Sequence, residues 1–165
     1  IEKNSKQILA KEKEVLLHII KRSIELKKNV VEKDEKESGL RQILNFGHTF
    51  GHAFEAYSDY KAKHGHCISL GIVVESKIAV LTGNLKGKGE QRIVSLLESF
   101  GLPVKVNSDI NLDKIMGIMV SDKKALDQKP RFVILMGIGK VKTDKVNFSF
   151  EVNDDIIKQS IEASK

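Results

Sequence analysis

Histidines gather in one short stretch of this chain. The sequence has five, and four of them, His48, His52, His64 and His66, lie between residues 48 and 66. His48 and His52 are four residues apart, so on a helix their rings project from one face about a turn apart. Such a pair can bind one metal ion, or place one metal ligand beside a proton-transfer group. His18 stands apart, and we interpret it as a surface or packing residue.

Two glycines, Gly47 and Gly51, directly precede this histidine pair. A glycine inside a helix costs roughly 1 kcal/mol relative to alanine, and close approach of another helix or a ligand is the natural reason to keep it. His64 comes twelve residues after His52, where its ring could swing back over the pair. Any one of these histidines could be an ordinary hydrogen-bonded polar group, but four together with paired glycines favour a site. Zn²⁺ is the first choice, because two imidazoles and a carboxylate suit it.

Sequence spacing does not identify the third metal ligand. Carboxylates near the histidines in the sequence are Asp34, Glu37, Glu55 and Glu75. Glu55 follows His48 by seven residues and shares its helical face, yet helix-dipole and packing roles suit it equally well. Spacing alone therefore selects none of them.

A stripe of polar side chains accompanies the histidines. Arg41, Asn45, His48 and His52 follow one another at intervals of four, three and four, so one helical face would carry a guanidinium, an amide and two imidazoles. Singly, such cations are more often surface charges, and the same holds for Lys27 and for the Lys123–Lys124 pair. Together the stripe predicts a site for an anionic, hydroxylated small molecule.

Helices are expected to position these residues. Apolar residues recur at spacings of three, four and seven over most of the chain. A continuous apolar run and a period-two run near the carboxy end predict two strands joined at a glycine turn. The expected helices span residues 5–33 (one helix or a pair), 39–56, 68–82 (with Gly83 at its end), 90–99, 111–120 and 155–163 (capped by Asn153 or Asp154), with a loop at 32–39, a connection at 57–65 and strands at 131–136 and 146–152.

Composition narrows the class of protein. The chain has 165 residues, 41% of them hydrophobic, and a net charge of +6. This predicts one mainly helical domain with a small β-hairpin. The charge suits solvated lysine-rich faces or an anionic small molecule. Nucleic acid is disfavoured, because only 5% of residues are aromatic. Cys67 is alone and indicates a reducing, intracellular setting, and Glu75 and Lys77 interrupt the apolar run 68–81, so we expect no membrane contact.

Three stretches resemble the 3-dehydroquinate synthase family, in the same order along the chain. They read KKNVVEKDEKESGLRQILNFGHTFGHAFEA, HGHCISLGIVVE and DKKALDQKPRFVILMGIGK. The resemblance implies the helical, carboxy-terminal, metal-binding half of a two-domain enzyme, with residues 1–165 as one domain for metal and substrate. An amino-terminal NAD-binding domain would be absent from this chain. The sequence starts without methionine, which agrees with a piece of a longer protein. We expect this piece to be inactive on its own.

The resemblance also implies roles for individual residues. The metal, Zn²⁺ or Co²⁺, would be held by His48 and His64, with a third ligand from a glutamate segment upstream of this chain. His52 would be a catalytic proton-relay group, and Lys27, Arg41 and Asn45 would hold the substrate carboxylate and hydroxyls. Glu37 would orient the basic residues, and Lys123 or Lys124 would help to bind the anion. Where the family has His-Gly-Glu, this chain has His-Gly-His, ending at His66.

The implied reaction is that of a carbon–oxygen lyase of the shikimate pathway. 3-Deoxy-arabino-heptulosonate 7-phosphate would become 3-dehydroquinate and phosphate, with NAD as a transient oxidant, in a cytoplasmic homodimer. Alternatives are a 2-deoxy-scyllo-inosose or valiolone synthase, in which residues that meet the carboxylate differ, and an iron-type alcohol dehydrogenase, which would not need the basic stripe. A further alternative is a non-catalytic folding and oligomerisation module.

Overall fold

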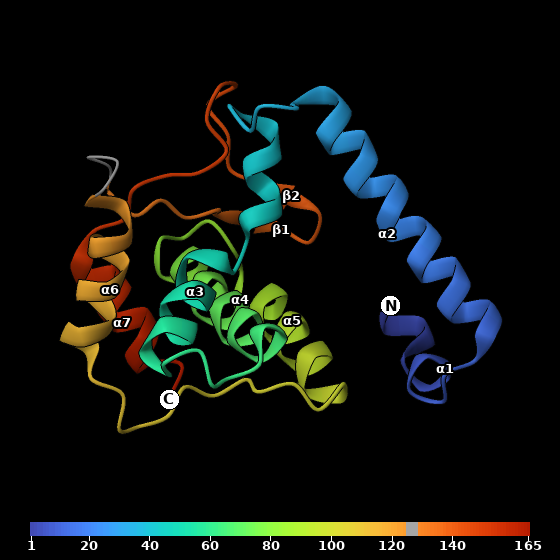
Figure 1. Ribbon diagram of the computed structural model, residues 1–165, viewed down its shortest axis with the longest axis horizontal. Helices are drawn as coiled ribbons and strands as arrows, with labels where there is room; N and C mark the ends of the chain where they lie inside the picture. Colours follow the sequence, from blue (N-terminus) through green and yellow to red (C-terminus); the bar gives the residue numbers. More distant parts are fainter. Residues whose placement is uncertain (125–128) are drawn as a thin grey trace.

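The structure, a computed structural model, describes the backbone of residues 1–124 and 129–165, and the side chains of 1–121 and 129–165. Helices dominate the described residues, and one small antiparallel hairpin accompanies them, as the sequence predicts (Figure 1). In chain order the elements are η1 (Glu2–Asn4), α1 (Ser5–Leu9), α2 (Lys13–Lys33), η2 (Leu40–Asn45), α3 (His48–Tyr57), α4 (His64–Leu81), α5 (Gly87–Ser99), α6 (Leu112–Lys124), β1 (Leu135–Gly137), β2 (Lys140–Val141) and α7 (Asp154–Glu162).

Helix α4 is the centre of the core. It contacts α3, α5, α7 and β1, and Val74, Ile78 and Ala79 on it are fully buried. A helix that is apolar on all sides is a core helix or a membrane span. By length and composition alone α4 could cross a membrane, but half of it is buried inside the protein. We therefore describe it as the core helix, against which the other elements pack.

Glycines let α3 and α4 approach closely, as their spacing predicts. A Cβ atom built on Gly71 of α4 would lie 1.9 Å from the carbonyl oxygen of Gly47, and one on Gly51 would lie 2.5 Å from the side chain of Ile68. No ordinary side chain fits at either position. The two helices therefore cross with backbone against backbone, and the histidines of α3 come to lie beside the start of α4.

The prediction of one continuous helix over residues 39–56 is wrong. The structure has a 3-10 helix, η2, then a break, then α3. Phe46 is extended and Gly47 has φ +80°, a left-handed conformation that favours glycine. Ahead of η2, the Asp34 carboxylate accepts hydrogen bonds from the backbone N–H groups of Ser38, Gly39 and Arg41. These bonds fix the loop before η2. The hydrogen bond from the backbone N–H of Arg41 contributes most to lowering the pKa of Asp34.

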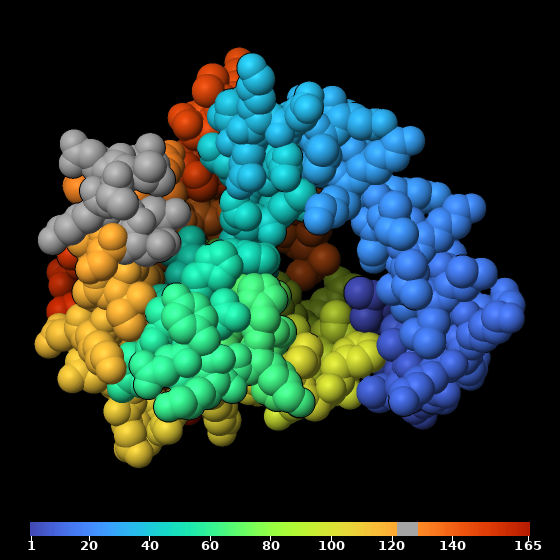
Figure 2. Space-filling model, in the orientation of Figure 1, coloured from blue at the N-terminus to red at the C-terminus, as the bar shows by residue number. Residues whose placement is uncertain are grey.

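The first predicted segment is a pair of helices, α1 and α2, separated at Lys11, which has φ +57°. Of the described residues, none in α2 is buried. Leu17, Ile20 and Ile24 are exposed on it, although the pattern predicts an amphipathic helix. Figures 1 and 2 show α2 standing apart from the α3–α4 core, and it contacts η2 and α1.

The predicted hairpin is present, but its strands are shorter than predicted. Its turn lies at the expected glycines, with Gly139 at φ +78°, and Leu135 pairs with Val141. The second strand is thus Lys140–Val141, and residues 146–152 supply only the bridge between Phe132 and Phe150. The reason is a local turn. The Asp144 carboxylate accepts the N–H groups of residues 146 and 147, which withdraws them from pairing with β1.

The remaining helices lie where the sequence places them, with shifted ends. Helix α4 starts four residues and α5 three residues earlier than expected, and α6 continues to Lys124. Gly83 follows α4 with φ +71°, as a C-terminal glycine should. The Asn153 side chain accepts the N–H of Asp155 and caps α7. Cys67 is buried, and burial raises the pKa of its thiol.

Candidate functional site

Three histidines converge where α3 meets the first turn of α4. The ring centroids of His48 and His52 are 5.5 Å apart, those of His48 and His64 are 5.9 Å apart, and those of His52 and His64 are 6.0 Å apart. His64 therefore does return over the α3 pair, as its position predicts. His66 is exposed on α4, and a residue two positions along a helix faces a different side from His64.

The rings of His48 and His64 each meet an acceptor at Nδ1. The Nδ1 atom of His48 lies 3.2 Å from the carbonyl oxygen of Phe46, at the break before α3. The Nδ1 atom of His64 lies 3.0 Å from Oε1 of Glu55. Since carbonyl and carboxylate oxygens only accept, each ring donates its Nδ1 proton in these bonds. Each neutral ring then carries its lone pair at Nε2, the state required of a metal ligand.

The tightest group of possible ligand atoms is a slightly different set. His52, Glu55 and His64 each offer one atom within 4.8 Å of the others. Two imidazoles and a carboxylate form a donor set typical of zinc sites. Among the described residues, Glu55 is thus the carboxylate whose oxygen groups with the histidine ligand atoms. The sequence could not select it from Asp34, Glu37 and Glu75.

A second group of side chains lies beside the histidines. The Asn45 amide donates to Oε1 of Glu37 at 2.5 Å, and the Arg41 guanidinium lies 3.7 Å from the other Glu37 oxygen. Lys27 of α2 joins them in lining a pocket of about 500 Å³. The predicted stripe is therefore divided between η2, which carries Arg41 and Asn45, and α3, which carries His48 and His52, because the single helix that was expected to carry it does not exist.

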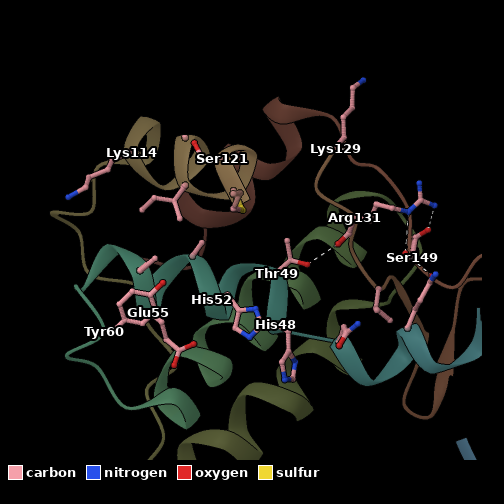
Figure 3. A pocket seen from close by; sticks show the side chains of 18 of the residues that line it. His48, Thr49, His52, Glu55, Tyr60, Lys114, Ser121, Lys129, Arg131 and Ser149 are labelled. Carbon is pink, nitrogen blue, oxygen red and sulfur yellow. Dashed lines mark hydrogen bonds between the residues drawn. The ribbon is translucent and has the colours of Figure 1, made fainter. Parts of the chain in front are cut away.

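The larger cavity, about 1070 Å³, continues from this group. Glu37, Asn45 and His48 line both cavities, and His52 lines the larger one. Across it lie basic residues from other parts of the chain, as Figure 3 shows. Lys114 comes from α6, and Lys129 and Arg131 come from the segment before β1.

Sequence reasoning did not single out Lys129 or Arg131 as site residues. Arg131 is held in place, since its guanidinium donates to the carbonyl oxygen and hydroxyl of Ser149, and its own carbonyl accepts from Thr49 of α3. The available signal was two basic residues immediately before the apolar run. The predicted Lys123 and Lys124 lie at the end of α6, and their side chains lie outside the described residues.

A buried carboxyl group, that of Glu75, lies beside the start of α3. Glu75 of α4 is fully buried, and neither carboxylate oxygen has a hydrogen bond of standard geometry among the described residues. Burial raises the pKa of Glu75 to about 8. The backbone N–H groups of Gly47, Thr49 and Phe50, at the start of α3, partly offset that rise. The carboxyl therefore faces the amino end of the helix that carries His48.

Solved structures share this arrangement of helices. 2-Deoxy-scyllo-inosose synthase, complexed with carbaglucose-6-phosphate, NAD⁺ and Co²⁺, matches with a TM-score of 0.80 and 24% identity, over 92% of this chain and 42% of that one. The 2-epi-5-epi-valiolone synthase of Streptomyces hygroscopicus subsp. jinggangensis, with NAD⁺ and Zn²⁺ bound, matches with a TM-score of 0.77 and 19% identity, over 92% and 41%. The chain thus has the fold of one part of these sugar-phosphate cyclases.

Sequence relatives define the family more closely. The family description "3-dehydroquinate synthase C-terminal" matches residues 1–125. The 3-dehydroquinate synthase of Thermodesulfovibrio yellowstonii is 40% identical over 160 residues, which are 96% of this chain and 43% of that protein. That of Pyrococcus furiosus is 43% identical over 147 residues, or 89% and 41%. The chain belongs to the 3-dehydroquinate synthase family, and it spans about two-fifths of the length of these relatives.

Proposed function

We propose that this chain is the metal- and substrate-binding half of a 3-dehydroquinate synthase, a carbon–oxygen lyase. Its substrate would be 3-deoxy-arabino-heptulosonate 7-phosphate and its products 3-dehydroquinate and phosphate. The observation that carries the proposal is that His48 and His52 face a cavity shared with Glu37 and Asn45, beside Arg41 and Lys27. Metal-type donors and carboxylate-binding cations thus lie within reach of one small ligand.

The residues present fit a divalent metal such as Zn²⁺ or Co²⁺. His48 and His64 would hold it through Nε2, since their Nδ1 atoms are occupied by the Phe46 carbonyl and by Glu55. When bound, such a cation acidifies the substrate hydroxyl groups that coordinate it. NAD, bound mainly by a separate amino-terminal domain, would supply the oxidation and the later reduction of one ring carbon.

The chain's own side chains would bind and orient the substrate. Arg41, Asn45 and Lys27 would hold the carboxylate and its neighbouring hydroxyls, and Glu37 would fix Arg41 and Asn45 through the contacts described above. His52 would accept the proton of the hydroxyl that is oxidised and return it later. Lys123 or Lys124 would contribute further positive charge to hold the anion.

The setting of the whole protein is part of the proposal. Residues 1–165 would form one metal- and substrate-binding domain of a cytoplasmic enzyme of aromatic amino acid biosynthesis, acting as a homodimer. Its partner is a small anionic sugar phosphate, without nucleic acid or membrane. The net charge of +6 supports an anionic substrate.

A related cyclase of the inosose or valiolone type is the second candidate, because solved structures of that type share the fold. The inosose synthase is complexed with carbaglucose-6-phosphate, a sugar-phosphate analogue that lacks the carboxylate of the heptulosonate. Substrate choice therefore separates the candidates in the protein that joins this chain to its NAD-binding half. We expect phosphate release from the heptulosonate phosphate and none from glucose 6-phosphate. The reverse preference would refute the proposed function.

A further inference from the structure

Glu55 joins the two helices of the histidine cluster. It lies in α3, and its Oε1 atom is 3.0 Å from Nδ1 of His64, the first residue of α4. The Glu55 side chain is only 17% exposed, whereas that of His64 is 57% exposed. Packing alone therefore does little to fix the His64 ring, and the largely buried Glu55 carboxylate is the group that can orient it.

The direction of this hydrogen bond decides which ring nitrogen can bind a metal. A carboxylate only accepts, so His64 donates from Nδ1 and keeps its lone pair at Nε2. The same logic holds for His48, whose Nδ1 meets the Phe46 carbonyl oxygen. Two rings from different helices are thus set in the same tautomer by two unrelated acceptors. Such outer partners of metal-binding histidines fix ring orientation and raise ligand basicity.

We propose that Glu55 is a positioning residue that holds His64 with its Nε2 atom ready to bind the metal. This inference rests on the proposed metal site and assigns a role to a carboxylate that the family resemblance leaves without one. Glu55 acts through His64 and does not itself touch the metal. Its hydrogen bond also ties the first turn of α4 to α3, so that His64 keeps its place near His48.

A competing geometry gives the inference a sharp test. Ligand atoms of His52, Glu55 and His64 all lie within 4.8 Å of one another, so Glu55 could bind a cation directly. A positioning carboxylate and a ligand carboxylate differ in what their removal does. Loss of a ligand changes the coordination of the bound metal. Loss of a positioning group weakens binding while the coordinating atoms stay the same.

The first measurement is Zn²⁺ affinity by calorimetry for the protein that joins this chain to its amino-terminal half, and for three variants of it. Glu55→Ala removes the acceptor and should lower the affinity about 10- to 100-fold, the usual effect of removing such a partner. Glu55→Gln keeps an amide oxygen as acceptor and should lose less. Glu98→Ala is the matched control, because Glu98 is an exposed glutamate on another helix, α5, and it should bind like the unaltered chain. Equal affinity in Glu55→Ala would overturn the inference.

Two spectroscopic readouts separate positioning from structure and from direct coordination. ¹⁵N NMR of the metal-free chain, with neutral imidazoles, should show His64 protonated at Nδ1, and Glu55→Ala should shift it toward Nε2 protonation. An unchanged tautomer would overturn the inference. The visible spectrum of bound Co²⁺ should keep its shape in Glu55→Ala, and a changed spectrum would show that Glu55 is a ligand. If the unaltered protein that contains both halves binds no Zn²⁺, the proposed metal site fails, whereas the tautomer still tests Glu55.

Discussion

Gly71 in α4 stands directly against Gly47, the residue that precedes α3. A Cβ atom on Gly71 would lie 1.9 Å from the Gly47 carbonyl oxygen and 2.9 Å from the amide nitrogen of Gly51. These neighbours are backbone atoms, which cannot move aside as the end of a flexible side chain can. The distance between α3 and α4, and with it the spacing of the histidine rings, therefore depends on the missing side chain at Gly71.

Gly71→Ala should destabilise the protein by about 1–3 kcal/mol or more, because an added methyl group in a filled interior forces the backbone apart. Gly117→Ala is the control. Gly117 lies within α6, and a Cβ atom there would meet nothing within 4 Å, so helix propensity should stabilise this variant by up to about 1 kcal/mol. Urea unfolding measures both changes. Equal stability of the two variants would refute the close-approach account.

Glu75 should make stability depend on pH. Its pKa is about 8 in the folded protein against an ordinary value of 4.5. Between these values the folded state holds a proton that the unfolded state has lost, so the free energy of unfolding falls as pH rises. One unit of pKa difference corresponds to about 1.4 kcal/mol. The contribution of Glu75 is thus complete below about pH 4.5 and is lost as pH approaches about 8.

Glu75→Gln isolates this effect, because glutamine has the same shape and does not titrate. Denaturant unfolding from about pH 5 to about pH 8 should give a steeper loss of stability for the unaltered protein than for the variant. The difference between the two free energies of unfolding at each pH cancels the contributions of the other titrating groups. Parallel curves would mean that the Glu75 carboxyl titrates alike in the folded and unfolded states.

Arg41→Met should weaken substrate binding in the protein that contains both halves. The Arg41 side chain is 32% exposed, and a hydrogen bond to a charged group contributes about 1.5–3 kcal/mol. We expect kcat/KM for the heptulosonate phosphate to fall roughly 10- to 100-fold, by those energies. Arg22→Met, on the exposed face of α2, should leave it unchanged. An unaltered KM and kcat in Arg41→Met would remove Arg41 from the substrate site.

Local chemistry explains which parts of the fold could be predicted. The Gly83 end of α4, the Asn153 cap of α7 and the glycine turn of the hairpin depend on neighbouring residues, and all three are confirmed. The break at Phe46 and Gly47 could not be predicted in the same way. A glycine in an apolar periodic run reads as helix interior, and only the approach of α4 shows that a left-handed residue is needed there.

The same distinction separates the parts of the candidate site that could be predicted from the sequence from those that could not. The histidine cluster could be predicted, because His48 and His52 share one helix and His64 begins the next. The partner of His64 could not, because Glu55 competes in sequence with three other carboxylates, and only the crossing of α3 and α4 selects it. Arg131 was missed for a similar reason, since its place beside Thr49 depends on a contact 82 residues apart in sequence.

The most direct test of the account is a calorimetric Zn²⁺ titration of the protein, of His48→Ala and of His18→Ala. His18 is an exposed histidine on α2, outside the cluster. We expect one Zn²⁺ site that His48→Ala weakens at least about tenfold and that His18→Ala leaves unchanged. Equal Zn²⁺ affinity in all three proteins would contradict a metal centre at the meeting point of α3 and α4.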